Sequence, residues 1–273
     1  MFALPAPPPE RLAIAGRDYR LSRVFKHDFF AATCLYRIAG ESGGAIVNIV
    51  VKFYRTQPIF GLPCGWLGRL LADHEQAIYR TLAGVRGVPQ WVARVGAAVY
   101  AIEYIDSAPL DHLEAAPAGF FDRLRELFDA VHDRGVGYCD ANKRSNILVA
   151  PDGEPFLVDY QISIRRREDW PWPLRAGQRV LVRYFAGKDL YHLYKHKRRL
   201  CPDELTAEEE ALSRCRTGWH RLHRKLTKPY RAFRRRFLRK EYQKGRLVSP
   251  TAELEDHDQP EKATWRVEKG KPQ

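Results

Sequence analysis

Residues 146–163, with the sequence NILVAPDGEPFLVDYQIS, constrain the fold more than any other segment of the chain. Two largely apolar segments at 146–149 and 155–160 flank the turn sequence PDG at 151–153, a pattern that predicts a short hairpin. A polar side chain stands at each end of it, Asn146 at the start and Asp159 directly after three apolar residues. A carboxylate placed in this way at the end of a strand is typical of a functional site.

The rest of the chain divides into a region rich in strands and a region rich in helices. β-branched and aromatic residues predict strands within 21–38, 45–54 and 99–105, while apolar residues at helical spacing predict helices over 66–82 and 121–136. A capping box at Thr206 and Glu209 predicts the start of another helix. We therefore expect an α+β fold with two lobes, an arrangement whose clefts usually hold ligands.

Composition excludes several classes of protein. With 45% hydrophobic residues among 273, the chain is not globally disordered. It has no run of about 20 apolar residues and no basic-then-apolar leader, so neither a spanning helix nor a signal peptide is predicted. The five cysteines are scattered without a CxxC pair, which favours a reduced, cytoplasmic setting and argues against a zinc site.

Five polar residues occur in an order that phosphoryl transfer from a nucleotide would explain. Lys52 lies near the end of a predicted strand and Glu75 on the following helix, whereas Asp140 and Asn146 lie in a loop before Asp159. Such a reaction uses a lysine on the phosphates, a carboxylate that holds the lysine, a base for the acceptor hydroxyl, and oxygen ligands for Mg²⁺. We therefore treat these residues as one candidate site.

In this order the residues resemble the protein-kinase-like superfamily over roughly 19–200. The sequence departs from typical kinases in several places: it has a bulky stretch at 25–33 instead of a glycine-rich loop, Asn146 comes six residues after Asp140, and the usual His-Arg-Asp is Tyr138-Cys139-Asp140. With these departures the sequence resembles an atypical bacterial branch of the superfamily, which includes lipopolysaccharide kinases and RIO-type kinases.

The resemblance implies a two-lobed protein-kinase-like domain at 18–213 with a reduced C-terminal lobe. The N-lobe would span about 18–105 and the C-lobe about 106–213, after a flexible N-terminal segment at 1–17. A basic helical extension at 214–246 and a disordered tail at 247–273 would follow.

The resemblance also implies a role for each site residue, with ATP and Mg²⁺ as cofactors. Asp140 would orient the acceptor hydroxyl as base, Lys143 would neutralise the transferred phosphoryl group, and Asn146 and Asp159 would hold Mg²⁺. Lys52 would bind the phosphates and Glu75 would hold Lys52. The hinge at Glu103 and Ile105 would meet the adenine edge, with Leu148 under the ring.

Each residue also has a purely structural interpretation. Lys52 could be a protective charge on an edge strand, and Glu75 could lie on the solvated face of its helix. Asp140 and Asn146 could be turn or cap residues, and Leu148 could be a core residue.

Residues 214–246 hold 14 Lys and Arg but one acid, so this segment carries a charge equal to the whole net charge of +13 and the rest of the chain is neutral overall. Apolar and aromatic residues at helical spacing lie between these charges, a pattern typical of a helix that binds an anionic membrane surface. The same residues could bind nucleic acid, or the apolar ones could pack on the body of the protein.

Taken together, the sequence predicts an ATP-dependent phosphotransferase with a hydroxyl acceptor. The favoured acceptor is a sugar of a lipopolysaccharide-type glycolipid. The protein would lie in the cytoplasm, with peripheral attachment to the inner face of the membrane. The alternatives are a RIO-like Ser/Thr protein kinase and a non-catalytic nucleotide-binding pseudokinase scaffold.

Overall fold

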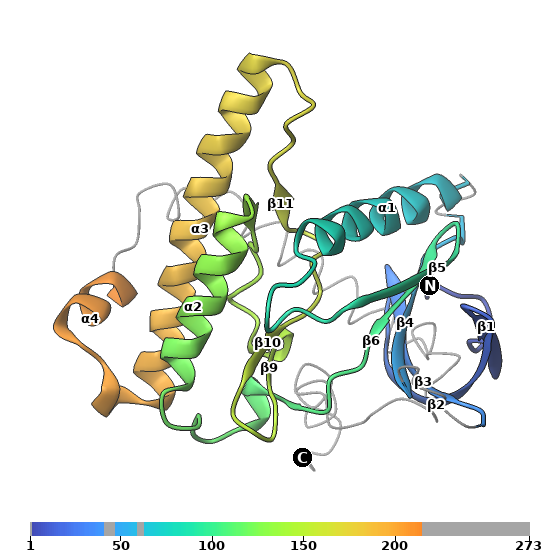
Figure 1. The fold of residues 1–273 in the computed structure, drawn as a ribbon, viewed down its shortest axis with the longest axis horizontal. Coiled ribbons are helices and arrows are strands. Elements are labelled where there is room, and N and C mark those ends of the chain that lie inside the picture. Colours follow the sequence, from blue (N-terminus) through green and yellow to red (C-terminus); the bar gives the residue numbers. More distant parts are fainter. Residues whose placement is uncertain (1, 41–46, 59–62, 215–273) are drawn as a thin grey trace, which may run out of the picture. The chain divides into compact units, whose positions relative to one another are not determined.

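The structure is a computed structural model that describes residues 2–40, 47–58 and 63–214, and its chain forms two compact units (Figure 1). Among these residues, unit 1 holds those up to Asp73 together with Trp91–Tyr104, and unit 2 holds His74–Gln90 and those from Ile105 onward. Helix α1 (Gly65–Thr81) contributes residues to both units. Of the predicted extension at 214–246, Arg214 alone is described, and 215–246 and the predicted tail at 247–273 lie outside the described residues.

Unit 1 is built on one antiparallel sheet of six strands in the order β1-β2-β3-β4-β6-β5. Buried side chains that alternate along the strands, such as Tyr36, Ile49 and Val51, form its core. The strands are β1 (Arg11–Ile14), β2 (Arg17–His27), β3 (Ala31–Ile38), β4 (Asn48–Tyr54), β5 (Trp91–Gly96) and β6 (Val99–Glu103).

The N-terminal segment differs from the expectation of a flexible lead-in at 1–17. Strand β1 lies within it and pairs with β2, with Arg11 opposite Arg20. The hydroxyl of Tyr36 donates to the carbonyl of Pro9 at 2.7 Å, and Tyr36 itself is fully buried. Pairing and burial thus attach the segment to the sheet, which the proline-rich composition did not indicate.

A tight turn occupies the position where typical kinases carry a glycine-rich loop. The carboxylate of Asp28 accepts hydrogen bonds from the backbone N–H groups of Phe30 at 2.7 Å and Ala31 at 2.9 Å, which closes the turn between β2 and β3. The guanidinium of Arg55 donates to the carbonyl of Phe29 at 3.2 Å and lies over its ring. The bulky stretch at 25–33 is therefore a side-chain-capped hairpin.

Unit 2 contains helices α2 (Phe120–Asp133), α3 (Trp172–Leu200) and α4 (Ala207–Arg214). Helices α2 and α3 run antiparallel, because Asp122 contacts Lys197 near one end and His132 contacts Asp189 near the other. The short elements of this unit are β7 (Ala108–Pro109), β8 (Val136–Gly137), β9 (Ile147–Val149), β10 (Pro155–Leu157), β11 (Ile164–Arg165), and the 3-10 turns Leu110–His112, Arg144–Asn146 and Pro202–Glu204.

The hairpin predicted at 146–160 is confirmed. Strands β9 and β10 pair antiparallel, with Ile147 opposite Leu157, and β9 also pairs with β7. The capping box is confirmed as well, since the backbone N–H groups of Thr206 and Glu209 each donate to the other residue's side chain. Within the described ranges, no helix combines the length and apolar character needed to cross a bilayer.

Candidate functional site

The loop after α2 brings Asp140, Lys143 and Asn146 together. Lys143 Nζ lies 2.7 Å from Asp140 Oδ2, and Asn146 Nδ2 donates to the same oxygen at 2.9 Å. Asp140 and Asn146 are each 8% exposed, whereas the side chain of Lys143 is 44% exposed. The extra residue falls between Asp140 and Lys143, where the backbone N–H of Lys143 donates to the carbonyl of Asp140 at 3.0 Å, and the turn Arg144–Asn146 follows. Three predicted catalytic and metal-binding residues therefore form one cluster in unit 2.

The surroundings of Asp140 shift the pKa of its carboxyl group. Burial raises the pKa of its carboxyl and the nearby Asp159 raises it further, while the contacts with Lys143 and Asn146 lower it, and the net direction is upward. A carboxylate with a raised pKa accepts a proton more readily than an exposed one, which suits a residue that receives the proton of a hydroxyl.

Asp159 follows β10 in a left-handed backbone conformation, with φ of 63°. This conformation is unfavourable for a residue other than glycine and recurs at functional sites. Tyr138, which is fully buried, donates its hydroxyl to the carbonyl of the preceding Val158 at 2.5 Å. The same hydroxyl lies 3.3 Å from the carbonyl of Asn146, so one phenol holds the backbone next to both predicted metal ligands.

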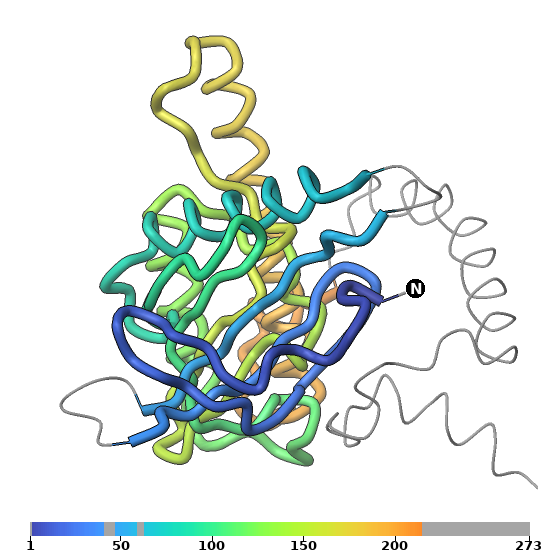
Figure 2. Tube along the Cα trace, turned by 90° about the vertical axis from the view of Figure 1, so that its right-hand side faces the viewer, coloured from blue at the N-terminus to red at the C-terminus, as the bar shows by residue number. Residues whose placement is uncertain are grey.

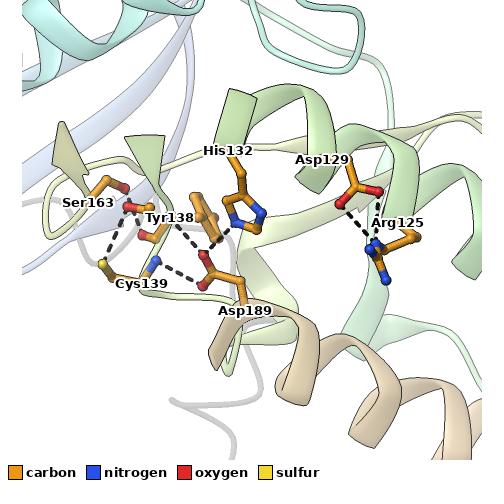
Figure 3. Close-up of polar contacts among 8 residues, drawn as sticks. Arg125, Asp129, His132, Tyr138, Cys139, Ser163 and Asp189 are labelled. Atoms are coloured by element: carbon orange, nitrogen blue, oxygen red, sulfur yellow. Dashed lines mark hydrogen bonds and ion pairs between the residues drawn. The ribbon is translucent and has the colours of Figure 1, made fainter. Parts of the chain in front are cut away.

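The loop is supported from below by Asp189 of α3, a residue that the sequence analysis missed (Figure 3). Its carboxylate accepts the backbone N–H of Tyr138 at 2.9 Å and that of Cys139 at 3.0 Å, and it lies 3.1 Å from His132 Nε2. Asp189 is 1% exposed, and Cys139 has a left-handed φ of 69°. Asp189 is the single acid of the 29-residue helix α3, and that was the signal by which it could have been found.

Further hydrogen bonds fix the start of the loop. Ser163 Oγ donates to the carbonyl of Tyr138 at 2.7 Å, and His74 Nε2 lies 2.9 Å from the carbonyl of Ser163. The ring of Tyr138 packs edge-on against that of Tyr160. The backbone of Tyr138 is thus held from α3 on one side and from the segment after Asp159 on the other.

Lys52 belongs to unit 1 and lies on an interior strand. Strand β4 pairs with β3 on one side, where Lys52 faces Thr33, and with β6 on the other, where it faces Tyr100. Lys52 is 7% exposed and its Nζ lies 5.1 Å from the centre of the Tyr54 ring. The interpretation as an edge-strand charge is therefore wrong, and a buried ammonium on a central strand requires a functional or structural reason.

Glu75 of α1 is fully buried, which makes the interpretation as a solvated helix-face residue wrong. It belongs to unit 2, where its charge contributes to raising the pKa of the buried Tyr160 hydroxyl, although burial is the larger cause. Burial of a carboxylate costs desolvation free energy, so Glu75 does not serve as a solubilising surface charge.

Of the residues predicted to meet the adenine edge, Glu103 belongs to unit 1 and Ile105 to unit 2. Glu103 ends β6, and the carbonyl of Ile105 accepts the hydroxyl of Ser107 at 3.0 Å. Leu148 is half-buried between the buried Ile147 and Val149, so it points to the opposite side of β9. It is thus not a fully buried core residue. Its contact with a nucleotide stays a prediction.

The buried His196 is a second residue of α3, besides Asp189, that contacts the backbone of the loop. Its Nε2 lies 2.9 Å from the carbonyl of Ala141, next to Asp140. Burial is the main cause that lowers the pKa of His196 to about 4, and Lys195, Arg144 and Arg199 lower it further. In the folded protein this imidazole is therefore neutral at pH 7.

This burial predicts a loss of stability in acid. Between pH 6.5 and 4 the unfolded chain binds a proton at His196 that the folded chain does not, so the free energy of unfolding falls as the pH falls, by roughly 3 kcal/mol when complete. Urea denaturation of the wild type and of His196→Gln at pH 7 and pH 4.5 measures it. The variant should lose less stability than the wild type, and equal losses would contradict the prediction.

The predicted Mg²⁺ ligands fit a cation held together with a nucleotide. Asn146 donates through Nδ2 to Asp140, so its Oδ1 is the atom left to bind a cation, and Asp159 supplies a carboxylate. In the described part of the chain no three His, Cys, Asp or Glu side chains gather into a metal site of their own. Proteins usually bind Mg²⁺ through one or two side chains plus phosphate oxygens and water.

Comparison with solved structures supports a kinase fold. The chain is similar to the crystal structure of the Rio2 kinase from Chaetomium thermophilum, with a TM-score of 0.50 and 17% identity over 70% of this chain and 62% of that one. The Rio2 kinase–ADP/Mg²⁺–phosphoaspartate complex of the same organism gives a TM-score of 0.48 and 17% identity over 68% and 57%.

The chain thus spans less than two thirds of the Rio2 kinase it matches. No protein-family model matches the sequence, and no curated protein matches it. At 17% identity the similarity is one of fold, and it extends over about 70% of the chain: this protein has an α+β fold that resembles the Rio2 kinase fold.

Proposed function

We propose that this protein is an ATP- and Mg²⁺-dependent phosphotransferase that transfers the γ-phosphoryl group to a hydroxyl acceptor. The observation that carries the proposal is the cluster in which Lys143 and Asn146 both contact one oxygen of the buried Asp140. It is combined with a kinase-like fold and with a lysine, Lys52, buried on a central strand. Positioning and electrostatic stabilisation of phosphates need these residue types.

In this proposal the residues act as follows. Asp140 accepts the proton of the acceptor hydroxyl as that oxygen attacks the γ-phosphorus, and the bond from this phosphorus to the bridging oxygen of the β-phosphate breaks to release ADP. Lys143, half-exposed beside Asp140, neutralises charge on the transferred group. Lys52 binds phosphate oxygens of ATP, and Asn146 and Asp159 hold Mg²⁺. When bound there, Mg²⁺ neutralises charge on the β- and γ-phosphates.

For the acceptor we propose a hydroxyl of a lipopolysaccharide-type glycolipid at the inner face of the membrane. Residues 160–171 alone separate Asp159 from α3, which leaves little chain for a segment that binds a peptide. The second candidate is a Ser or Thr hydroxyl of a protein, which the similarity to Rio2 kinase favours. Transfer of labelled phosphate from ATP to glycolipid extracts or to protein extracts distinguishes the two.

The first test is the thermal stability of the protein with Mg²⁺-ATP. At ATP concentrations tenfold above Kd, we expect the melting temperature to rise by about 3–5 °C in the wild type. The rise should disappear in Asp159→Asn and persist in Asp152→Asn, which removes an exposed acid from the turn between β9 and β10. A wild type that does not respond to millimolar ATP would contradict the proposal and favour a scaffold without nucleotide.

A further inference from the structure

The first part of α3 extends away from the rest of unit 2. Val182 is the first buried residue of this helix, and it packs with Phe185 next to Gly137 of β8. The residues before it, together with the returning segment from Arg166, form a projection that Figures 1 and 2 show in yellow. We call residues 166–183 the arm. A hydrogen bond from the backbone N–H of Arg167 to Gln178 Oε1, at 2.9 Å, joins the returning segment to the helix.

Large apolar side chains on the arm are exposed. Trp172 is 73% exposed, Leu174 54%, Val180 69% and Leu181 47%. At 100° per residue, Leu174 and Leu181 share one side of the helix, Trp172 lies on nearly the opposite side, and Val180 lies between them. The exposed apolar side chains therefore extend over about 200° of the helix circumference instead of forming one narrow stripe.

The arm is also basic. Five arginines stand against two acids between 166 and 183. Asp169 pairs with Arg167, and Glu168 pairs with Arg166 and lies 3.9 Å from Arg175. Arg175, Arg179 and Arg183 follow one another at intervals of four residues and so form one stripe along the helix. Among the described residues, Arg179 and Arg183 form no ion pair, which leaves their charge available to an anion.

We propose that the arm inserts into the interface of an anionic lipid bilayer. A fluid interface can cover leucine and valine side chains over a wide arc of a helix at once, while the arginine stripe and Trp172, which lies on the same side, meet lipid phosphates and headgroups. One protein surface would cover Leu174 and Leu181 or Trp172, but not both sides. A nucleic acid would contact the arginines and leave Leu174, Val180 and Leu181 in water.

This surface is distinct from the basic extension at 214–246 and lies within unit 2, the unit that holds Asp140. The proposal does not depend on phosphoryl transfer, since bilayer binding is measured without ATP. If the arm binds lipid and the ATP test fails, the membrane contact stands alone.

Flotation of the full chain with vesicles tests the proposal. The vesicles contain equal parts of phosphatidylcholine and phosphatidylglycerol, at about 0.15 M salt. Trp172→Ser/Leu174→Ser should lower the partition coefficient by roughly tenfold. The matched control Leu212→Ser, which removes a 49% exposed leucine from α4, should leave the coefficient within about twofold of the wild type. All three proteins retain residues 214–246, so a loss of binding confined to Trp172→Ser/Leu174→Ser comes from the arm.

A charge variant separates the two contributions. Arg175→Gln/Arg179→Gln/Arg183→Gln should weaken binding to the mixed vesicles by roughly tenfold or more, and hardly change binding to pure phosphatidylcholine. Unchanged partition of the serine variant would overturn the proposal. If partition is unchanged and the oligomeric mass of that variant differs from that of the wild type, the arm joins two copies of the chain, and the proposal is likewise overturned. Thermal unfolding of each variant confirms that it is folded.

Discussion

Replacing Asp140 with asparagine should lower the rate of phosphoryl transfer by about 10²- to 10⁴-fold, the contribution expected of a general base. The amide retains the size of the carboxylate and can still accept a hydrogen bond from Lys143 or Asn146, but it cannot take the proton of the acceptor hydroxyl. The measurement is transfer of labelled phosphate from ATP to glycolipid extract, with Asp140→Ala as a second variant that also removes the contacts.

Two controls make this result specific. Asp203→Asn removes an exposed acid just beyond the end of α3, and its rate should equal that of the wild type. The rise in melting temperature with Mg²⁺-ATP should persist in Asp140→Asn, because in our proposal Asp140 acts on the acceptor and not on the nucleotide. Transfer by Asp140→Asn at the wild-type rate would refute the assigned role.

The second large effect is expected at Asp189. Replacement with alanine leaves two backbone N–H groups, of Tyr138 and Cys139, without their acceptor and removes the partner of His132. Since all these contacts are buried or nearly so, we expect the free energy of unfolding to fall by about 3–5 kcal/mol. Transfer activity should fall as well, because Cys139 has a strained backbone that precedes Asp140 directly.

Urea denaturation with comparison of midpoints and slopes measures this loss. Asp133→Asn is the matched control, an exposed acid at the end of α2 next to His132, and it should change stability by less than about 0.5 kcal/mol. Asp189→Asn should fall between the wild type and Asp189→Ala, because its amide offers one acceptor oxygen where the carboxylate offers two. A change below 1 kcal/mol in Asp189→Ala would contradict the support assigned to this residue.

The elements that were predictable from the sequence are those whose signals are local. The β9–β10 hairpin has a turn sequence between two apolar runs, and α1 and α2 have apolar residues at helical spacing, so their boundaries were close to those observed. Strands β1 and β5 were missed, because β1 follows a proline-rich stretch and β5 is half-buried along its whole length without alternation.

In the candidate site, order along the chain identified Asp140, Lys143 and Asn146, and their mutual contacts agree with that selection. Asp189 could not be identified in the same way, because it acts from a helix some 50 residues away and has no motif around it. The left-handed conformations of Cys139 and Asp159 were also beyond the sequence, since neither is the glycine that usually marks such a position.

Asp189 holds the loop through main-chain N–H groups, and that choice of partner has a consequence for how such sequences can diverge. Every residue except proline offers the same N–H group, so positions 138 and 139 can change their side chains while the anchor is retained. A tripeptide pattern such as His-Arg-Asp can thereby become Tyr-Cys-Asp without loss of these two hydrogen bonds. Distant relatives of this chain are better sought by a solitary acid in a long basic helix than by the letters that precede the aspartate.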